Sequence, residues 1–249
     1  MKYISQIFVL LIVLFLGCSR ENPEVTNNPP EVQKIFPINE ISLTIPEPSG
    51  IAYNSINNSL MVVSDGRPEI YEIDFSGNIL NSIVTAGADM EGICLSKNCD
   101  TIYVVEEKKK LVTTFNLNGS KLSSFSVDVA TSDNSALEGI SIKKSSNTLY
   151  IINEKDPGML LAYSNQSELW RRSLTYTLDI SDIYFEELEN CFWLISDESS
   201  MIFKLDNNGI LINKWEIPFT KGEGITIVND KVYVVNDSNA KMYIFQKPN

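Results

Sequence analysis

Histidine is absent from this chain of 249 residues, although the chain has 10 tyrosines and 11 phenylalanines. Without an imidazole, the protein cannot carry a Ser-His-Asp or Cys-His catalytic set, a histidine zinc site or a histidine switch near neutral pH. Any acid-base or metal chemistry must therefore use carboxylates, lysines, tyrosines or backbone groups. The sequence also lacks a G-x-S-x-G elbow, a Walker loop, a Rossmann glycine set and an EF-hand loop.

Positive charge is scarce as well. The chain has 20 Lys and Arg against 32 Asp and Glu, which gives a formal net charge of -12. Nucleic-acid binding depends on attraction between basic side chains and phosphates, so we expect no nucleic-acid partner. Cations are the more natural ligands of such a chain.

The N-terminal apolar run, Ile7 to Leu16, has ten residues and is too short to span a bilayer. Lys2 precedes this run, and a glycine followed by Cys18 ends it, which is typical of a bacterial lipoprotein signal peptide over residues 1–17. Cys18 would then be the first mature residue and would carry lipid. An ordinary signal peptide or a buried apolar strand are the alternatives. Residues 18–32 contain three prolines and few apolar residues, which predicts a flexible tether.

These features predict an exported monomer held at a membrane of the bacterial cell envelope through Cys18, with the outer membrane as first choice. Three other cysteines remain: Cys94, Cys99 and Cys191. An odd number excludes a fully paired disulfide framework. Cys94 and Cys99 could pair across a turn, but we favour unpaired structural thiols.

The rest of the chain contains a repeat built on short apolar runs. Five runs recur: Leu60 to Val63, Ile102 to Val105, Leu149 to Ile152, Phe192 to Ile195 and Val232 to Val235. Two residues after each run stands an acid, which gives Asp65, Glu107, Glu154, Asp197 and Asp237 (the outer row). An earlier strand starts at Ser49, Glu91, Glu138, Ser181 and Glu223 (the inner row). The steps between these starts are 42, 47, 43 and 42 residues.

The repeat predicts an all-β fold. After the third strand of each copy, a hairpin turn is expected at Gly77, Gly119, Asn165 or Gly209, where a left-handed backbone costs little. Four antiparallel strands in about 40 to 45 residues is the size of one β-propeller blade. The last copy lacks its fourth strand, and the stretch Ile35 to Ile45 can supply it. We therefore predict a single five-bladed propeller over residues 33–249, with six blades or an open solenoid as alternatives.

Within a blade, the start of the first strand and the end of the second lie at the same end of the central channel. The inner and outer rows therefore converge, and eight carboxylates crowd one channel mouth, nine if Glu106 turns inward. Oxygen ligands without histidine or thiolate favour calcium or magnesium over zinc. Calcium is our first choice, because it accepts six to eight oxygens in loose geometry. Glu91, Glu138 and Glu223 are the strongest candidates among the ligands.

A purely structural interpretation stays open. The acids could cap backbone amides in turns, and four cations stand near them in the sequence: Arg67, Lys108, Lys155 and Lys221. The run Lys108-Lys109-Lys110 is typical of a solvated hairpin tip. Trp170, Trp193 and Trp215 are expected to pack between blades.

These motifs carry a resemblance. The segments Asn153-Glu154-Lys155-Asp156-Pro157 and Ser196-Asp197-Glu198-Ser199, together with Glu-Gly-Ile at 91–93, 138–140 and 223–225, resemble the SdiA-regulated family. This resemblance implies an envelope β-propeller linked to calcium, with phytase-like or esterase-like ancestry. Single Glu-Gly-Ile units also resemble phytase-like and gluconolactonase-like propellers. A lactonase mechanism that uses histidine does not fit this chain.

Three functions follow. The first is an envelope-anchored propeller that binds a divalent cation at its channel mouth and presents a surface to a small molecule or protein. The second is a metal-dependent hydrolase of a phosphoester or lactone, in which the metal polarises the substrate and a carboxylate activates water; a two-carboxylate glycosidase is a weaker enzyme reading. The third is a metal-free structural or interaction propeller. The residues themselves name no catalytic set.

Overall fold

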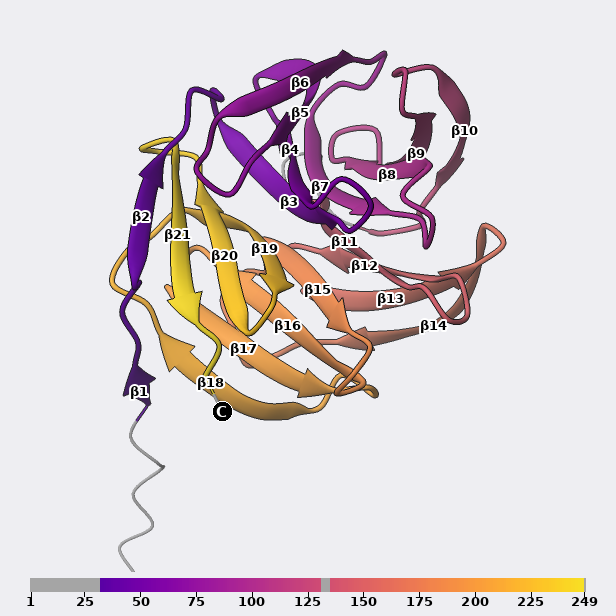
Figure 1. Ribbon diagram of the computed structural model, residues 1–249. Coiled ribbons are helices and arrows are strands. Elements are labelled where there is room, and N and C mark those ends of the chain that lie inside the picture. Colours follow the sequence, from indigo (N-terminus) through magenta and orange to yellow (C-terminus); the bar gives the residue numbers. More distant parts are fainter. Residues whose placement is uncertain (1–31, 131–134, 249) are drawn as a thin grey trace, which may run out of the picture. The chain divides into compact units, whose positions relative to one another are not determined.

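The computed structural model describes residues 32–130 and 135–248, and these residues form strands and turns without a helix. The strands build five antiparallel sheets arranged in a ring (Figure 1), so the predicted five-bladed β-propeller is confirmed and the six-bladed alternative is excluded. Blade 1 contains β3 (Pro48–Asn54), β4 (Ser59–Ser64), β5 (Arg67–Ile73) and β6 (Ile79–Val84). Blade 2 contains β7 (Met90–Leu95), β8 (Thr101–Glu106), β9 (Leu111–Asn116) and β10 (Lys121–Ser126).

The remaining blades follow the same pattern. Blade 3 contains β11 (Leu137–Lys143), β12 (Thr148–Asn153), β13 (Met159–Ser164) and β14 (Ser167–Ser173). Blade 4 contains β15 (Asp182–Glu186), β16 (Cys191–Ser196), β17 (Met201–Asp206), β18 (Leu211–Glu216) and β1 (Gln33–Lys34). Blade 5 contains β19 (Gly222–Val228), β20 (Lys231–Asn236), β21 (Lys241–Gln246) and β2 (Asn39–Ser42).

The ring closes as the sequence predicts. Strand β2 pairs antiparallel with β21, with Asn39 opposite Ile244, and so supplies the missing outer strand of blade 5 (Figure 1). The structure adds a second closure that the sequence did not reveal. Strand β1 pairs in parallel with β18, and Lys34 forms an ion pair of 2.6 Å with Glu216. Two outer edges are thereby covered by the start of the described chain, which protects them from strand addition.

The core lies between the blades. Five clusters of buried apolar residues each combine side chains of two neighbouring blades. Trp193 and Trp215 stack with ring centroids 5.4 Å apart inside the cluster that blade 4 shares with blade 5. Trp170 packs at the edge of the cluster between blades 3 and 4. The tryptophans therefore pack between blades, as predicted, because each second strand is apolar on both faces.

The hairpin turns also follow the prediction. Gly77, Gly119 and Gly209 have φ of 82°, 80° and 77°, and Asn165 has φ of 47°. These angles are the left-handed values that glycine and asparagine adopt at low cost. The cysteines Cys94, Cys99 and Cys191 are all buried and unpaired, which confirms the prediction of structural thiols.

Candidate functional site

A repeated triplet of residues lies at the start of each innermost strand and organises the central channel. These strands are β3, β7, β11, β15 and β19. The first residue of every triplet lines a cavity of about 200 Å³ at one end of the channel. These first residues are Ser49, Glu91, Glu138, Ser181 and Glu223, the complete inner row. The third residue of every triplet lines a different cavity at the other end. We call the first of these the acidic cavity.

The outer row reaches the acidic cavity almost completely. Asp65, Glu154, Asp197 and Asp237 line it. Glu107 is buried beside it, with a carboxylate oxygen close to oxygens of Glu138 and Glu154. The structure therefore brings together all eight predicted carboxylates.

Glu106 does not line this cavity. It is bonded instead to the Thr113 hydroxyl at 2.5 Å and the Lys109 ammonium at 2.5 Å. The predicted ninth carboxylate, Glu106, is thus turned away from the cavity.

Three further acids, not predicted from the sequence, form a row with Lys221, which the sequence had already placed near the acids of the inner and outer rows. Glu47, Asp89, Asp179 and Lys221 each stand two residues before an inner-row position, and three of them line the acidic cavity. Glu47, Asp89 and Lys221 share a positive φ of 45°, 58° and 62°. The signal in the sequence is the constant position of these residues, two before each inner-row residue. Blade 3 breaks this pattern, because it has Ala136 at the equivalent position.

Burial and mutual repulsion dominate the electrostatics of the acidic cavity. Burial raises the pKa of Glu138 well above its ordinary value of 4.5, and the nearby charges of Glu91 and Glu154 raise it further. Burial likewise raises the pKa of Glu91 well above its ordinary value, with Asp65 adding to the effect. Burial and the charge of Asp237 raise the pKa of Glu223 to about 7. A cluster of this kind is costly unless it is protonated, paired or metal-bound.

Two trios of acids have the spacing that one cation requires. Asp65, Asp89 and Glu91 each place a carboxylate oxygen within 4.8 Å of the others, and so do Glu107, Glu138 and Glu154. Ligand oxygens around a single calcium ion lie about 2.3 to 2.6 Å from the metal, so they are at most roughly 5 Å apart. Both trios therefore fit a hard divalent cation.

Lysines neutralise part of the cavity, as the structural interpretation expected. Lys221 lies 2.7 Å from Asp197 and 3.8 Å from Glu223, so it neutralises acids of the mouth that belong to neither trio. Lys155 bridges Glu154 at 2.8 Å and Glu198 at 2.9 Å.

The trio of Glu107, Glu138 and Glu154 is paired with one lysine, Lys155 at Glu154, just as the first trio is paired with Lys108. Lys108 pairs with Asp89 in the first trio rather than with the adjacent Glu107. Glu107 accepts a backbone hydrogen bond of 3.3 Å from Ala136. Glu138 has neither a hydrogen-bond donor nor an ion-pair partner among residues 32–130 and 135–248.

Some acids at the mouth act as caps instead. Asp179 accepts hydrogen bonds from the Ser196 hydroxyl, the Asp197 amide and the Glu198 amide. Asp197 in turn accepts the Lys221 amide at 2.5 Å. These carboxylates are already satisfied within the protein, so they hold the loops of blades 4 and 5 in place.

The middle residue of each triplet forms a narrow waist below the acidic cavity. It is glycine in four blades: Gly50, Gly92, Gly139 and Gly224. A Cβ on Gly92 would stand 2.5 Å from the Glu138 carbonyl oxygen of the next blade, and one on Gly50 would stand 2.4 Å from the Glu91 carbonyl oxygen. Glycine is therefore required for the blades to approach this closely.

Blade 4 has Asp182 in the glycine position. Its side chain is 1 % exposed, and its Oδ2 accepts a hydrogen bond of 2.9 Å from the Ile225 amide of blade 5. Its Oδ1 is buried without a hydrogen-bond partner in the described structure. Burial raises the pKa of Asp182 well above its ordinary value of 3.8.

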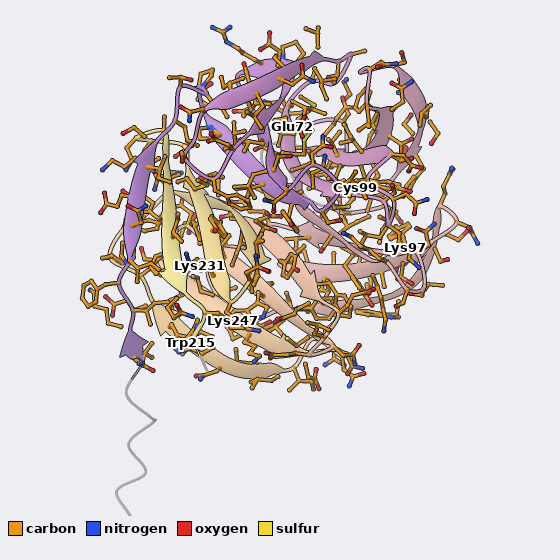
Figure 2. The ribbon with its side chains drawn as sticks, in the orientation of Figure 1. Glu72, Lys97, Cys99, Trp215, Lys231 and Lys247 are labelled. Carbon is orange, nitrogen blue, oxygen red and sulfur yellow. The ribbon has the colours of Figure 1, made fainter. Side chains whose placement is uncertain are left out.

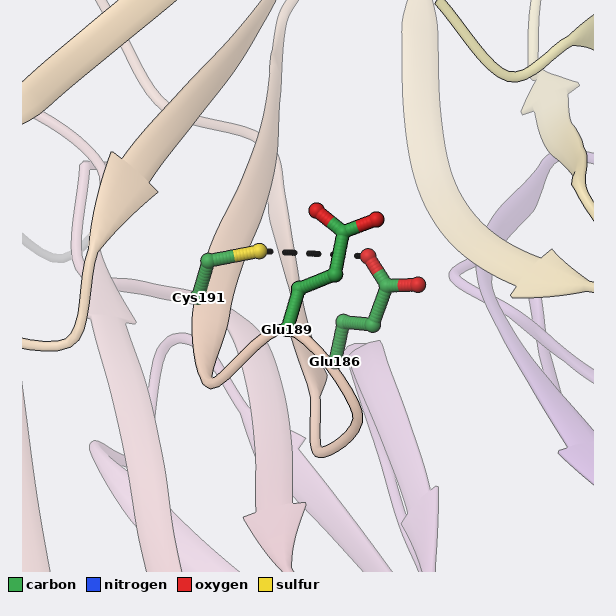
Figure 3. Close-up of side chains that lie close together, drawn as sticks. All are labelled: Glu186, Glu189 and Cys191. Carbon is green, nitrogen blue, oxygen red and sulfur yellow. Dashed lines mark hydrogen bonds between the residues drawn. The ribbon is translucent and has the colours of Figure 1, made fainter. Parts of the chain in front are cut away.

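A third acidic group lies away from the mouth. Glu186, Glu189 and Cys191 also place potential ligand atoms close together (Figure 3). Lys247 lies 2.5 Å from Glu186 and 2.6 Å from Glu189, and Lys204 lies 2.5 Å from Glu189. The charges of this group are thus balanced by two lysines, which makes it an ion-pair network that fixes the end of the described chain, near Trp215 in Figure 2.

Cys18, the predicted signal peptide and most of the tether lie outside the described residues. Where the structure is described, from 32 to 130 and from 135 to 248, no helix is long and apolar enough to cross a membrane.

Residues 33–249 match the sequence model of the SdiA-regulated family. The chain belongs to the SdiA-regulated family. The resemblance stated from the Asn-Glu-Lys-Asp-Pro and Ser-Asp-Glu-Ser segments is thus confirmed. No curated protein matches this SdiA-regulated chain.

Solved structures share the fold of this SdiA-regulated protein at low identity. A gluconolactonase from Xanthomonas campestris has a TM-score of 0.57 at 11% identity, covering 83% of this chain and 88% of its own. A streptogramin B lyase has a TM-score of 0.53 at 16% identity, covering 85% and 73%. A nidogen–laminin complex has a TM-score of 0.55 at 14% identity, covering 76% and 72%. At such identities the likeness concerns the fold alone.

Proposed function

We propose that this SdiA-regulated propeller binds a divalent cation, calcium in the first place, in the acidic cavity at its channel mouth. The observation that carries the proposal is Glu138, whose carboxylate stands among other acids without a donor or cation in the described structure. Burying such a group uncompensated is costly, and a cation between Glu107, Glu138 and Glu154 removes the cost. The oxygen-only ligand set suits calcium or magnesium.

Asp65, Asp89 and Glu91 form the second proposed cation position. Lys108 pairs with Asp89 there, as Lys155 pairs with Glu154 in the other trio, so each trio has one lysine. Glu138 has no hydrogen-bond donor or cation beside it in the described structure, so we expect the trio around Glu138 to bind more tightly. Beside Asp197 and Glu223, the Lys221 ammonium supplies the positive charge that a metal would supply at the two trios.

The predicted lipid on Cys18 completes the proposal. It holds the propeller at a membrane of the bacterial cell envelope, the outer membrane in first place, as a monomer. A lipid chain on Cys18, followed by the tether, lets the channel mouth face solutes or a protein partner near that membrane. Mass spectrometry of the protein from membranes tests this: the wild type carries lipid at Cys18, and a Cys18→Ser variant is released to the soluble fraction.

Calorimetry and thermal melting, with calcium added to metal-free protein, test the cation. We expect saturable heat and a rise in melting temperature at millimolar calcium, because the ion binds only the folded cluster. Glu138→Gln should remove most of this response, whereas Glu187→Gln, at the opposite end of the channel, should keep it. No heat and no shift in the wild type would refute the proposal.

A hydrolase is the second candidate, and the acidic cavity is the observation that favours it. The structurally similar gluconolactonase shows that a related fold hosts hydrolysis in another protein. A metal held by the trio around Glu138 would polarise a phosphoester or lactone oxygen. Of the chain's own groups, Glu223, with its pKa raised to about 7, can accept a proton from water near neutral pH. A panel of phosphoesters and lactones, assayed with and without chelator, decides this: turnover that survives both chelator and Glu138→Gln contradicts it.

A further inference from the structure

The second cavity lies at the opposite end of the channel from the acidic cavity, and it differs from that cavity in chemistry. Its volume is about 480 Å³, within the range of sites that bind small organic molecules. The third residue of each inner-strand triplet lines it, so every blade contributes one isoleucine: Ile51, Ile93, Ile140, Ile183 and Ile225. The apolar wall is extended by Leu95, Ile142, Phe185 and Ile227. We call this second cavity the apolar cavity.

The waist separates the two cavities. Neither Asp182 nor any of the four waist glycines lines either cavity. The glycines bring neighbouring backbones into contact, and the Asp182 side chain fills the equivalent place in blade 4. A ligand in the apolar cavity therefore does not reach the carboxylates of the acidic cavity.

Polar side chains also line the apolar cavity, and those of Tyr53, Ser141, Glu186 and Glu187 are engaged within the protein. Thr226 and Tyr184 are lining residues whose hydroxyls have no hydrogen-bond partner in residues 32–130 and 135–248. Ser141 is different, because its hydroxyl oxygen already accepts the Phe185 amide at 2.8 Å. Unpaired hydroxyls in an apolar wall are the usual means of orienting a small ligand.

The rim carries charges of both signs. Its charged lining residues are Lys144, Glu186, Glu187 and Asp230. Glu186 pairs with Lys247 at 2.5 Å, and Glu187 accepts the Ser145 amide at 2.8 Å. The acids of the lining outnumber its one lysine, which disfavours an anionic ligand. The acidic cavity has many more acids, and seven carboxylates of the inner and outer rows line its wall: Asp65, Glu91, Glu138, Glu154, Asp197, Glu223 and Asp237.

We propose that the apolar cavity is a second ligand site, which binds a small, uncharged, mainly apolar organic molecule that hydrogen-bonds to the hydroxyls of Tyr184 and Thr226. The site is independent of the cation proposal, because the waist lies between them. The protein then holds a hard cation at one end of the channel and an apolar molecule at the other.

Fluorescence titration of the full chain with the uncharged dye N-phenyl-1-naphthylamine tests the site. We expect saturable binding of one dye per chain, tighter than binding of the anionic dye 1-anilinonaphthalene-8-sulfonate. Thr226→Phe fills the cavity and should weaken dye binding at least about tenfold at an unchanged melting temperature. Glu138→Gln, in the acidic cavity, should leave dye binding unchanged.

Three results would overturn the proposal: no saturable binding of the uncharged dye, unchanged affinity in folded Thr226→Phe, or tighter binding of the anionic dye.

If Thr226→Phe does not fold, thiol labelling of the wild-type chain tests the site instead. Cys94 lines the cavity, whereas Cys99 and Cys191 do not. The dye should slow labelling of Cys94 and leave the labelling of the other two unchanged; equal labelling of Cys94 with and without dye also overturns the site.

Discussion

Asp182 Oδ2 accepts a hydrogen bond of 2.9 Å from the Ile225 amide across the boundary between blades 4 and 5. The other four blades have glycine at this position, so Asp182 is the only side chain in the waist of the channel. The contact links two blades through a buried carboxyl group. The carboxyl group is also titratable, and its charged form is energetically unfavourable in this buried position.

Asp182→Asn should stabilise the protein, and the gain should grow with pH. The folded-state pKa of Asp182 is raised above 3.8, so the folded protein holds a proton that the unfolded chain releases, and wild-type stability falls as pH rises above that value. Asparagine resembles the neutral form and keeps an acceptor for the Ile225 amide. Melting curves of both proteins at pH 4 and pH 8 check this, with a rise of roughly 2–4 °C per kcal/mol for a domain of this size. An equal difference at both pH values would contradict it.

Glu138→Gln should have opposite effects with and without calcium. In chelator, the variant should melt above the wild type, because one buried negative charge is removed from the cluster. In calcium, the wild type should melt above the variant. Glu187→Gln serves as the matched control and should follow the wild type in both conditions. A lower melting temperature in both conditions would mean that Glu138 is structural.

Calcium affinity should weaken as pH falls below neutrality. The acids of the cavity must be deprotonated to bind a metal, and the pKa of Glu223 is raised to about 7 while that of Glu138 is raised well above 4.5. Each proton that must leave changes the affinity by up to about tenfold per pH unit. Calorimetric titrations at pH 5.5, 6.5 and 7.5 measure this slope. A constant affinity would indicate that calcium binds outside the acidic cavity.

Lys221→Met should make the protein more dependent on calcium. The variant removes the ammonium that lies 2.7 Å from Asp197 and 3.8 Å from Glu223, so these two carboxylates lose their ion-pair partner. We expect a lower melting temperature in chelator and a larger calcium-induced rise than in the wild type. Lys144→Met at the other end of the channel is the control. An unchanged calcium response would show that Lys221 does not substitute for a cation.

Lys247→Met should destabilise the ring independently of calcium. The Lys247 side chain is 10 % exposed and bridges Glu186 and Glu189, so its loss leaves two carboxylates with less compensation at a cost of about 1–3 kcal/mol. Lys34→Met breaks an ion pair in which both side chains are almost half exposed, and should cost about 0–1 kcal/mol. Chemical denaturation of the two variants compares them. Similar losses would show that the network around Lys247 adds little.

The sequence predicted the blades because their signal is local. The apolar runs of the second strands, the turns at Gly77, Gly119 and Gly209 and the acid after each run all repeat at nearly constant steps. The carboxylates of the mouth were predicted for the same reason: the blade symmetry places equal positions at the same end of the channel. Closure by the segment around Asn39 followed from counting the strands of the last repeat.

Other features depend on what breaks the repeat or joins distant segments. Lys221 replaces an acid of the row formed by Glu47, Asp89 and Asp179, so counting acids alone could not place it. The parallel pairing of Gln33 with Trp215 joins segments far apart in the chain and has no periodic signal. Asp182 was visible as an exception to Glu-Gly-Ile, but only the packed waist shows that a side chain there is completely enclosed.

The pairing of β2 with β21 also constrains how the protein folds. Asn39 meets Ile244 across almost the whole domain, and Lys34 meets a residue 182 positions away. Contacts of such long range slow folding, because a large loop must be ordered before the contact forms. Blades 1 to 3 can assemble as the chain emerges, but the ring cannot close until the last strand is available. Closure of the ring, by the pairing of β2 with β21, is therefore the last step of folding.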